Sequence, residues 1–455
     1  MPRIIILIMR KQRIIYWLVM LLPALPLQAQ RQWTLDDCIS HAMQHNITLQ
    51  KSKLQLQSAS EDVKQQKGAL LPSLNASTNH SIGYQPWKDN GIATVTNGQV
   101  NAKVDKTYYN GSYGLNAQWT VWNGGRNRNN VKMSQLSEQQ AELSVSEQAN
   151  SIEERICQLY TQCLYMREAI RVDSAMLQTS LKNENRGKEM VEAGLLAKAD
   201  LAQLTSQRAS DEYNVVEAWS QLENYMLQLR QLLELKANDQ FDIADTEASD
   251  AQALAPTPSL VDVYEQALAQ RPEIKSRQIG IESANVQLAI AKAGHLPTIA
   301  ITGGASTSTN SLSNNGWGNQ MKTNFGLTGG LQLSMPIFDG RQTKTNVEKA
   351  KLQQMQAQLD LADQQKQLYQ TIEGYWLDAT TNQQKLHAAT ANVESAQASY
   401  DLLQEQFNVG LKNIAELLNG KGQLLQAQQN RLQAKYLTLL NQQLLRLYAG
   451  AHSSH

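Results

Sequence analysis

Two stretches, Trp119–Asn130 (WTVWNGGRNRNN) and Met335–Asn346 (MPIFDGRQTKTN), decide how this chain folds. Each runs from an apolar segment through an aromatic residue and an Asn-Gly or Asp-Gly pair into a polar, basic segment. Residues before each pair alternate between apolar and polar, which indicates a half-buried strand, and Asn and Asp are favoured helix N-caps. Each stretch therefore predicts a strand that leads directly into a helix, with Asn123 and Asp339 at the helix starts.

The sequence around these stretches occurs twice. A shift of 225 positions aligns Leu35–Gln50 with Leu260–Lys275 and Pro72 with Pro297, and a shift of 216 aligns Gly194 with Gly410. A long tandem repeat of this kind indicates one structural unit built twice. We predict a first repeat over residues 30–235 and a second over 260–448. An irregular linker rich in acid, Ala and Pro (236–259) joins them, and a tail (449–455) follows.

Each repeat has the same predicted order of elements. A helix of roughly 35 residues ends at Pro72 or Pro297, because proline lacks the N–H that would continue it. A strand pair follows, within residues 73–122 or 298–337, and then a long helix, over 126–193 or 341–409. A glycine ends the long helix, and a returning helix covers 199–235 or 414–448. Helices of about 68 residues span about 100 Å, so the two shorter helices fit end to end beside each long one. Four parallel columns per chain result.

The second long helix carries two neighbouring apolar stripes, which predict helices on both of its flanks, as in a wall. The first stripe is Val347, Ala350, Ala357, Leu361, Leu368, Ile372 and Tyr375, and the second is Leu352, Met355, Leu359, Ala362, Tyr369 and Trp376. An ordinary long coiled coil would explain the helices alone equally well.

The N-terminus predicts a secretory signal peptide over residues 1–29. Arg10, Lys11 and Arg13 precede an apolar run, and a small residue at Ala29 permits cleavage; a retained membrane anchor is the alternative. The full chain has 41 basic and 41 acidic residues. Removing residues 1–29 removes four bases and no acid, so 37 bases against 41 acids leave a net charge of −4. With no extended basic patch, nucleic acid is not a predicted partner.

No catalytic, cofactor or metal site is predicted. Cys157 and Cys163 lie six residues apart on a predicted helix and point about 240° around it, so free thiols are expected. Cys38, His41 and His45 share helical spacing, but three ligands on one helix lack a fourth partner and a closed site. No HExxH, P-loop, GxSxG or paired-carboxylate motif stands in a fitting context, which argues against an enzyme.

After residue 30, no apolar run is long enough for a membrane helix, so membrane entry would require β-strands. A transmembrane barrel needs at least eight strands, and this chain supplies four. Three copies would give twelve strands and twelve helical columns, which form a ring with a lumen of about 25 Å. Aromatic residues suited to a membrane interface lie near the strand ends: Tyr108, Tyr109, Trp119, Trp122 and Phe338.

This duplicated order of elements resembles the TolC family of outer-membrane efflux and secretion channels. The resemblance covers essentially the whole mature chain. It includes the Leu-Pro junctions at Pro72 and Pro297, the strand exits at Asn123 and Asp339, and the Gly-Leu helix turns. It implies a homotrimer with four β-strands of a shared 12-stranded barrel per chain and a long periplasmic α-helical barrel. It also implies an outer-membrane location with lipid contacts, a periplasmic adaptor protein, an inner-membrane transporter, and passive transport.

The resemblance also assigns roles at the helix turns. It places adaptor docking at Gly194, Leu195, Gly410 and Leu411; a glycine C-cap with an apolar contact would give the same sequence pattern. It places the entrance acids at Glu416 and Asn419, of which only Glu416 is acidic. It implies a latch between Lys412 and Asp200, which would be weaker than one formed by arginine, because lysine lacks the bidentate fork. Alternatively, both are solvated charges, since exposed pairs contribute only about 0–1 kcal/mol.

Two other classes of protein compete with an export duct. A non-conducting trimeric coiled-coil adhesin or envelope spacer would not need a duplicated pair of alternating strands with aromatic ends. An outer-membrane enzyme would need a reactive triad, and the seven histidines show no such setting. The exported cargo is not encoded in any motif, because a polar lining rich in Gln and Ser suits many cargoes.

Overall fold

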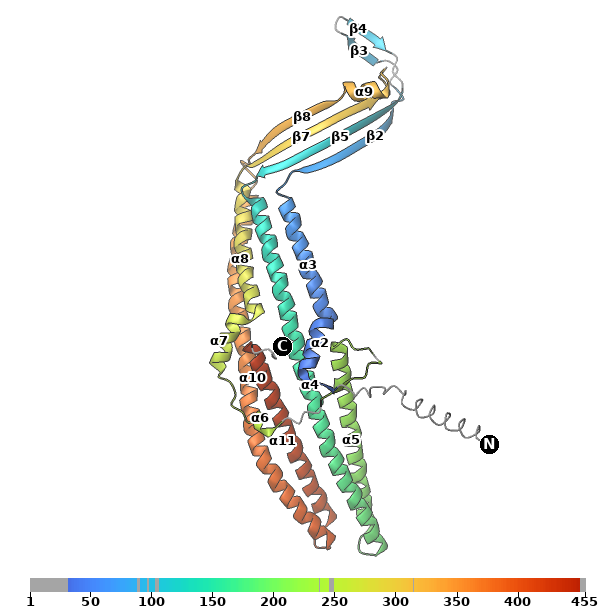
Figure 1. The fold of residues 1–455 in the computed structure, drawn as a ribbon, viewed down its shortest axis with the longest axis vertical. Helices are drawn as coiled ribbons and strands as arrows, with labels where there is room; N and C mark the ends of the chain where they lie inside the picture. The colour runs from blue at the N-terminus through green and yellow to red at the C-terminus, as the bar shows by residue number, and fades with distance from the viewer. Residues whose placement is uncertain are drawn as a thin grey trace, which may run out of the picture.

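The computed structural model describes residues 32–87, 91–95, 98–102, 106–236, 238–244, 249–313 and 315–450. The predicted signal peptide and the last five residues of the predicted tail lie outside the described residues. The described chain is elongated, with a β-sheet at one end and long helices that fill the rest (Figure 1). No helix within these ranges has both the length and the apolar composition needed to cross a membrane.

The two repeats contain matching elements in the same order. The first contains β1 (Gln32–Trp33), α2 (Leu35–His45), α3 (Ile47–Gly68), β2 (Ser73–Tyr84), the hairpin β3 (Gly91–Val95) and β4 (Gly98–Ala102), β5 (Thr107–Trp122), α4 (Arg126–Glu192) and α5 (Lys198–Leu232). The second contains α7 (Leu260–Gln270), α8 (Pro272–Lys292), η1 (Ala293–His295), β7 (Thr298–Asn310), α9 (Trp317–Thr323), β8 (Gly326–Ser334), α10 (Gln342–Asn408) and α11 (Ile414–Tyr448). The strand β8 ends at Ser334, just before Met335 and Pro336, and is therefore shorter than predicted.

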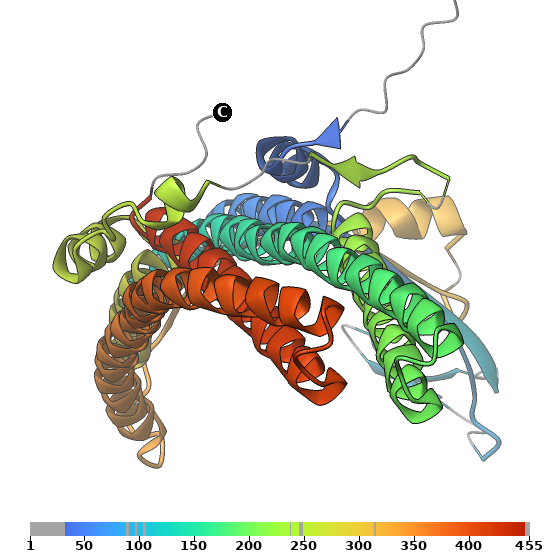
Figure 2. The same ribbon diagram turned by 90° about the horizontal axis from the view of Figure 1, so that it is seen from below.

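Four strands form one antiparallel sheet in the order β2-β5-β7-β8. The central pair joins the repeats, with Leu115 of β5 opposite Ala305 of β7. The helices continue from this sheet as a curved wall (Figures 1 and 2). Next to the sheet the order across the wall is α3, α4, α8 and α10, and at the far end it is α5, α4, α11 and α10. The two shorter helices of each repeat therefore lie beside the long one.

The prediction of one unbroken helix before each strand pair is wrong, because both copies break in two. In the first, Asn46 is extended (φ −61°, ψ 124°), and its side chain caps α3 by accepting from the Leu49 amide at 3.1 Å. In the second, Arg271 has nearly the same conformation, and Pro272 begins α8. The breaks let α2 and α7 leave the wall and lie on its outer, convex side (Figure 2).

The long helix α4 begins at Arg126 as predicted, and α10 begins at Gln342, one residue later than predicted, but the N-caps of both lie two residues beyond the predicted ones. Their N-cap residues are Gly125 and Arg341, at φ 82° and 74°, rather than Asn123 and Asp339. Asn123 still accepts a hydrogen bond from the Asn127 amide at 3.1 Å, and Asp339 accepts one from the Thr343 amide at 2.8 Å. These side chains therefore cap the first turn from outside the helix.

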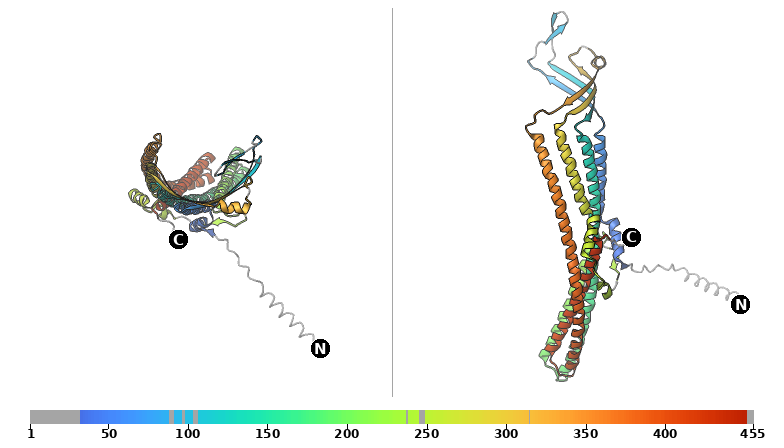
Figure 3. Two further views of the ribbon diagram at one scale, coloured as in Figure 1. Left: turned by 90° about the horizontal axis from the view of Figure 1, so that it is seen from above. Right: turned by 90° about the vertical axis from the view of Figure 1, so that its left-hand side faces the viewer.

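The linker at residues 236–259 is more ordered than predicted. It contains β6 (Asp242–Ile243), which pairs in parallel with β1, and α6 (Asp250–Ala253), which contacts α11. The helix α4 binds this layer through Arg167, which donates to the carbonyl of Ile243 at 2.8 Å, and through Tyr160, which donates to the carbonyl of Trp33 at 3.2 Å. With α2 and α7, the linker forms a belt around the outside of the wall (Figure 3).

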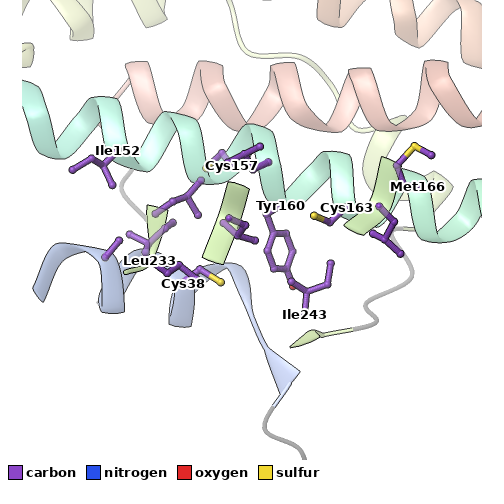
Figure 4. Packing of buried hydrophobic residues seen from close by; sticks show 14 of the residues in the cluster. Cys38, Ile152, Cys157, Tyr160, Cys163, Met166, Leu233 and Ile243 are labelled. Carbon is purple, nitrogen blue, oxygen red and sulfur yellow. The ribbon is translucent and has the colours of Figure 1, made fainter. Parts of the chain in front are cut away.

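The largest buried apolar cluster lies beneath this belt, between α2, α4, α5 and β6 (Figure 4). It contains Cys38, Cys157 and Cys163, all of them free and buried. Burial raises the pKa of each thiol to about 12, so the three side chains act as small apolar groups at neutral pH. His41 and His45 stack on each other with ring centroids 4.1 Å apart, whereas Cys38 is fully buried in the cluster. Within the described ranges, no group of three His, Cys, Asp or Glu side chains could hold a metal ion.

Candidate functional site: an apolar sheet face and a tip of two helix turns

The strand register gives the sheet one apolar and one polar face. Side chains alternate across a strand, so paired residues share a face. The apolar face carries Leu74 and Ile82 of β2, Leu115 and Trp119 of β5, Ile299 and Ile301 of β7, and Leu327, Leu331 and Leu333 of β8. The polar face carries Asn75, Ser77, Asn116, Gln118, Thr302, Thr328, Gln332 and Ser334.

The apolar face is exposed within the monomer. Leu74, Ile82, Leu327 and Leu331 are each between 72% and 77% exposed. Soluble monomers rarely expose a contiguous apolar patch of this kind, and larger ones mark contacts with a protein or a membrane. The face therefore requires a cover that the described residues of one copy do not supply.

Both lateral edges of the described part of the molecule are open. The strands β2 and β8 each have a hydrogen-bonding neighbour on one side only, and such edges are templates for another strand. Along the wall, the first predicted stripe of α10 packs inward, with Ile372 fully buried. The second stripe is open to solvent, with Leu352 and Leu359 64% and 70% exposed. On α5, at the opposite edge, Tyr213 and Val216 are 67% and 63% exposed.

The end of the wall far from the sheet, here called the tip, is made of the α4–α5 and α10–α11 turns. Gly194 and Gly410 adopt φ of 73° and 78°, which favours glycine. The amide of Leu195 bonds to the carbonyl of Met190 at 2.8 Å, and that of Leu411 to the carbonyl of Gln406 at 2.9 Å. Both turns are therefore Schellman motifs.

The leucines of these turns do not make the apolar contact that commonly accompanies a Schellman motif. The residue after the glycine commonly packs back on its helix. Leu195 and Leu411 instead remain 74% and 75% exposed. Both turns thus present a large apolar side chain to the surroundings, at positions related by the internal repeat.

The predicted gate residues lie close to the starts of the returning helices. Lys412 pairs with Glu416 at 2.6 Å, and the two side chains are 40% and 41% exposed. Asn419 is exposed one turn further along α11, and Asp200 lies in the first turn of α5. In the part of the chain that the structure describes, Lys412 has no ion pair with Asp200. The latch between them stays a prediction.

A buried charged cluster behind the tip was missed at the sequence level. Lys421 of α11 donates to Asp211 of α5 and to Ser180 of α4, and Ser180 also donates to Asp211. Gln207 donates to the second carboxylate oxygen of Asp211 at 3.0 Å. The side chains of Lys421 and Asp211 are both only 2% exposed. Burial lowers the pKa of the Lys421 ammonium, and the Asp211 carboxylate opposes that shift. This cluster ties the second repeat to both helices of the first hairpin.

Heptad spacing could have revealed the cluster. Along α11, the residues Ile414, Leu417, Lys421 and Leu424 are spaced by three, four and three residues. Ile414, Leu417 and Leu424 are all buried. That spacing is the core stripe of a packed helix pair, where a solvated lysine is not expected. The neighbouring Gly420 lets α11 pack closely on its other flank, against α10, because a Cβ there would lie 2.5 Å from a methyl of Leu403.

Comparisons with known proteins agree with this architecture. The family model for outer membrane efflux proteins matches residues 38–234 and 263–451, one segment in each repeat. The chain is 23% identical to the outer membrane efflux protein BepC of Brucella suis biovar 1 (strain 1330) over 90% of its own length and 83% of that protein. It is 23% identical to the outer membrane protein TolC of Escherichia coli (strain K12) over 72% of each. The fold superposes on the CmeC outer membrane channel of Campylobacter jejuni with a TM-score of 0.76, at 18% identity, over 92% of this chain and 87% of that one.

The match to both repeats covers well over half of the chain, so the protein belongs to the outer membrane efflux protein family. The resemblance to TolC is confirmed, and so is the predicted function as an outer membrane exit channel for efflux or secretion. The alternative of a non-conducting adhesin or spacer is not favoured. The roles of the individual tip residues stay predictions.

Proposed function

We propose that three copies of the chain close edge to edge into one continuous duct. The observation that carries this proposal is the pair of open edges at the two ends of one curved wall. Strand β8 of one copy would pair with β2 of the next, and α10 would cover α3 and α5. Pairing in this way satisfies the free backbone groups of both strand edges and buries the second apolar stripe of α10. Trimer-sized migration of the membrane-extracted protein that collapses on heating is the expected first sign.

The two faces of the sheet support the orientation of that duct. With the polar face inside, Asn, Ser and Gln side chains line a wet path, and the leucines of the outer face meet lipid. The sheet then lies in the outer membrane. Helices of 67 residues carry the path about 100 Å into the periplasm.

The exposed tip leucines support docking of a periplasmic adaptor, which would connect the duct to an inner-membrane transporter. We expect Leu195→Asp and Leu411→Asp to lower crosslinking of the channel to its adaptor in cells by about ten-fold or more, as for a lost hot-spot side chain. Lys198→Asp adds a carboxylate at the same tip without removing an apolar side chain, so it is the matched control. Equal crosslinking in all three variants would exclude docking through these leucines.

Lys412 and Glu416 support a gate at the tip, where three copies would place three such pairs around the entrance. We expect a small, cation-favouring conductance of the purified protein in a planar bilayer. Lys412→Ala frees Glu416 and should raise both the conductance and the cation preference. The increase should stay within about five-fold, because an exposed pair contributes only about 0–1 kcal/mol.

The matched control for the gate is Lys198→Ala, which removes another lysine of the tip, at the start of α5. If Lys412→Ala and Lys198→Ala have the same conductance, the channel proposal is kept but the gating role of Lys412 is excluded. If neither the intact wild-type trimer nor the Lys412→Ala trimer conducts, a sealed or structural protein is favoured over the duct. Asp200→Asn tests the predicted latch in the same recording, because it should reproduce the Lys412→Ala increase only if the two residues are linked.

A further inference from the structure

One short helix interrupts the apolar face of the sheet. The helix α9 lies between β7 and β8 and contacts β7 at the end of the sheet far from the long helices (Figure 1). Thr307 and Thr309 share the face of Ile301 and Ala305, and Thr307 bonds to α9, which lies on the outer side of the molecule (Figure 3). Thr309 is only 4% exposed there, whereas the leucines nearer the long helices are bare.

Hydrogen bonds fix α9 in this place. Thr307 donates to the carbonyl of Met321 at 2.9 Å, and the Asn310 amide donates to the side chain of Gln320 at 2.7 Å. Gln320 is 6% exposed. Asn324, at the end of the helix, donates to the carbonyl of Ser308 at 2.7 Å. With this many polar contacts to β7, α9 is a built part of the sheet rather than a loose loop.

The outward side of α9 is polar. Gly318 and Lys322 are exposed on the opposite side from Gln320, and Asn319 and Thr323 on the flanks of the helix are exposed as well. Such a surface cannot lie in hydrocarbon without leaving polar groups unsatisfied. Trp317, at the start of the helix, is 59% exposed and packs edge-on against Tyr113. Tryptophan with one apolar and one wet side is typical of the membrane interface.

The length of the bare apolar face places α9 at a membrane boundary. From Ile299 to Thr307 the strand rises about 27 Å at about 3.4 Å per residue, or about 20 Å along the normal at a tilt of about 40°. The apolar band of an outer-membrane strand is about 25 Å tall. The polar helix thus begins where the hydrocarbon should end.

We propose that α9 lies in the headgroup layer of the outer leaflet and sets the depth of the sheet, with Lys322 against anionic lipid headgroups. The inference rests on the proposed membrane location of the sheet. A lysine next to an anionic surface gains attraction that falls off within a Debye length. Continuity of α9 with the lipid-facing side of the sheet selects lipid, rather than a protein, as the partner.

Nitroxide labels on introduced cysteines test this proposal, because the three native cysteines are buried and should not react. Asn319→Cys, Leu327→Cys and Leu195→Cys would be labelled separately in the full-length trimer, reconstituted into phosphatidylcholine vesicles with and without phosphatidylglycerol. Collision rates with oxygen and with a nickel chelate give the depth of each label. We expect hydrocarbon values at Leu327, aqueous values at Leu195, and values between the two at Asn319.

The outcomes separate the two proposals. An aqueous Leu327 label would exclude the membrane location of the sheet. If the Leu327 label is embedded in lipid, the Asn319 label decides the place of α9. Collision rates at Asn319 equal to those at Leu195, or equal to those at Leu327, would exclude α9 from the headgroup layer. Lys322→Glu should raise nickel access at Asn319 by up to about five-fold in vesicles with phosphatidylglycerol and not in phosphatidylcholine alone. No difference between the two lipids would overturn the role of Lys322.

Discussion

Lys421→Met is expected to destabilise the tip by about 3–5 kcal/mol, because it leaves the Asp211 carboxylate buried without its cation. Asp211 would keep only the hydrogen bonds from Ser180 and Gln207, and it lies where water does not reach. Hydrogen exchange of α4, α5 and α11 amides around the cluster measures this local opening directly. A loss of 3 kcal/mol or more corresponds to exchange at least about 100-fold faster.

Two comparisons show whether burial is the cause. Lys412→Met also breaks a lysine–carboxylate pair on α11, but that pair is about 40% exposed, so the loss should stay within about 1 kcal/mol. Removing both charges, as Lys421→Met with Asp211→Leu, should recover much of the loss, because no unpaired charge remains. If Lys421→Met and Lys412→Met change exchange equally, the buried pair does not hold the tip together.

The repeat, the long helices and the alternation of the strands could be predicted from the sequence because each is a local pattern. The shift that aligns Asn123 with Asp339 also aligns the tip glycines, so the order of elements in one repeat predicted the order in the other. The stripe of Leu352 and Leu359 predicts a second neighbour for α10; both side chains are exposed in a single copy, so that neighbour stays a prediction. Periodicity reports which faces are apolar, whatever finally covers them.

Other features depended on contacts that local patterns do not contain. Asn46 reads as an ordinary helical residue until its side chain is seen to cap α3, so the break after α2 was missed. The linker at 236–259 lacks periodicity, yet β6 gains order from β1, about two hundred residues away in the sequence. Lys421 was not singled out in the sequence, because its partners Ser180 and Asp211 belong to the other repeat. A charged residue at a core position of the helix stripe, such as Lys421, is the sequence signal that predicts such a buried cluster.

Leu331→Arg is expected to destabilise the inserted sheet by about 2–4 kcal/mol, the cost of an arginine on the lipid face of a membrane strand. Leu331 is 74% exposed on the apolar face, opposite Ile301. The matched control is Gln332→Arg, one residue further along the same strand, whose side chain points to the polar face. There the guanidinium meets water in the duct, so we expect little loss of stability.

Yield of heat-modifiable trimer in the outer membrane, followed by urea unfolding in vesicles, compares Leu331→Arg with Gln332→Arg. Because the two variants share strand, charge and size, their difference reports only which face meets lipid. A loss confined to Leu331→Arg would establish the orientation of the sheet. The reverse order would mean that the polar face is turned outward, and equal stability would mean that neither face lies in hydrocarbon. In either of those cases three copies could still pair through β2 and β8, but the sheet would not lie in the membrane as proposed, since a membrane barrel requires its apolar face outside.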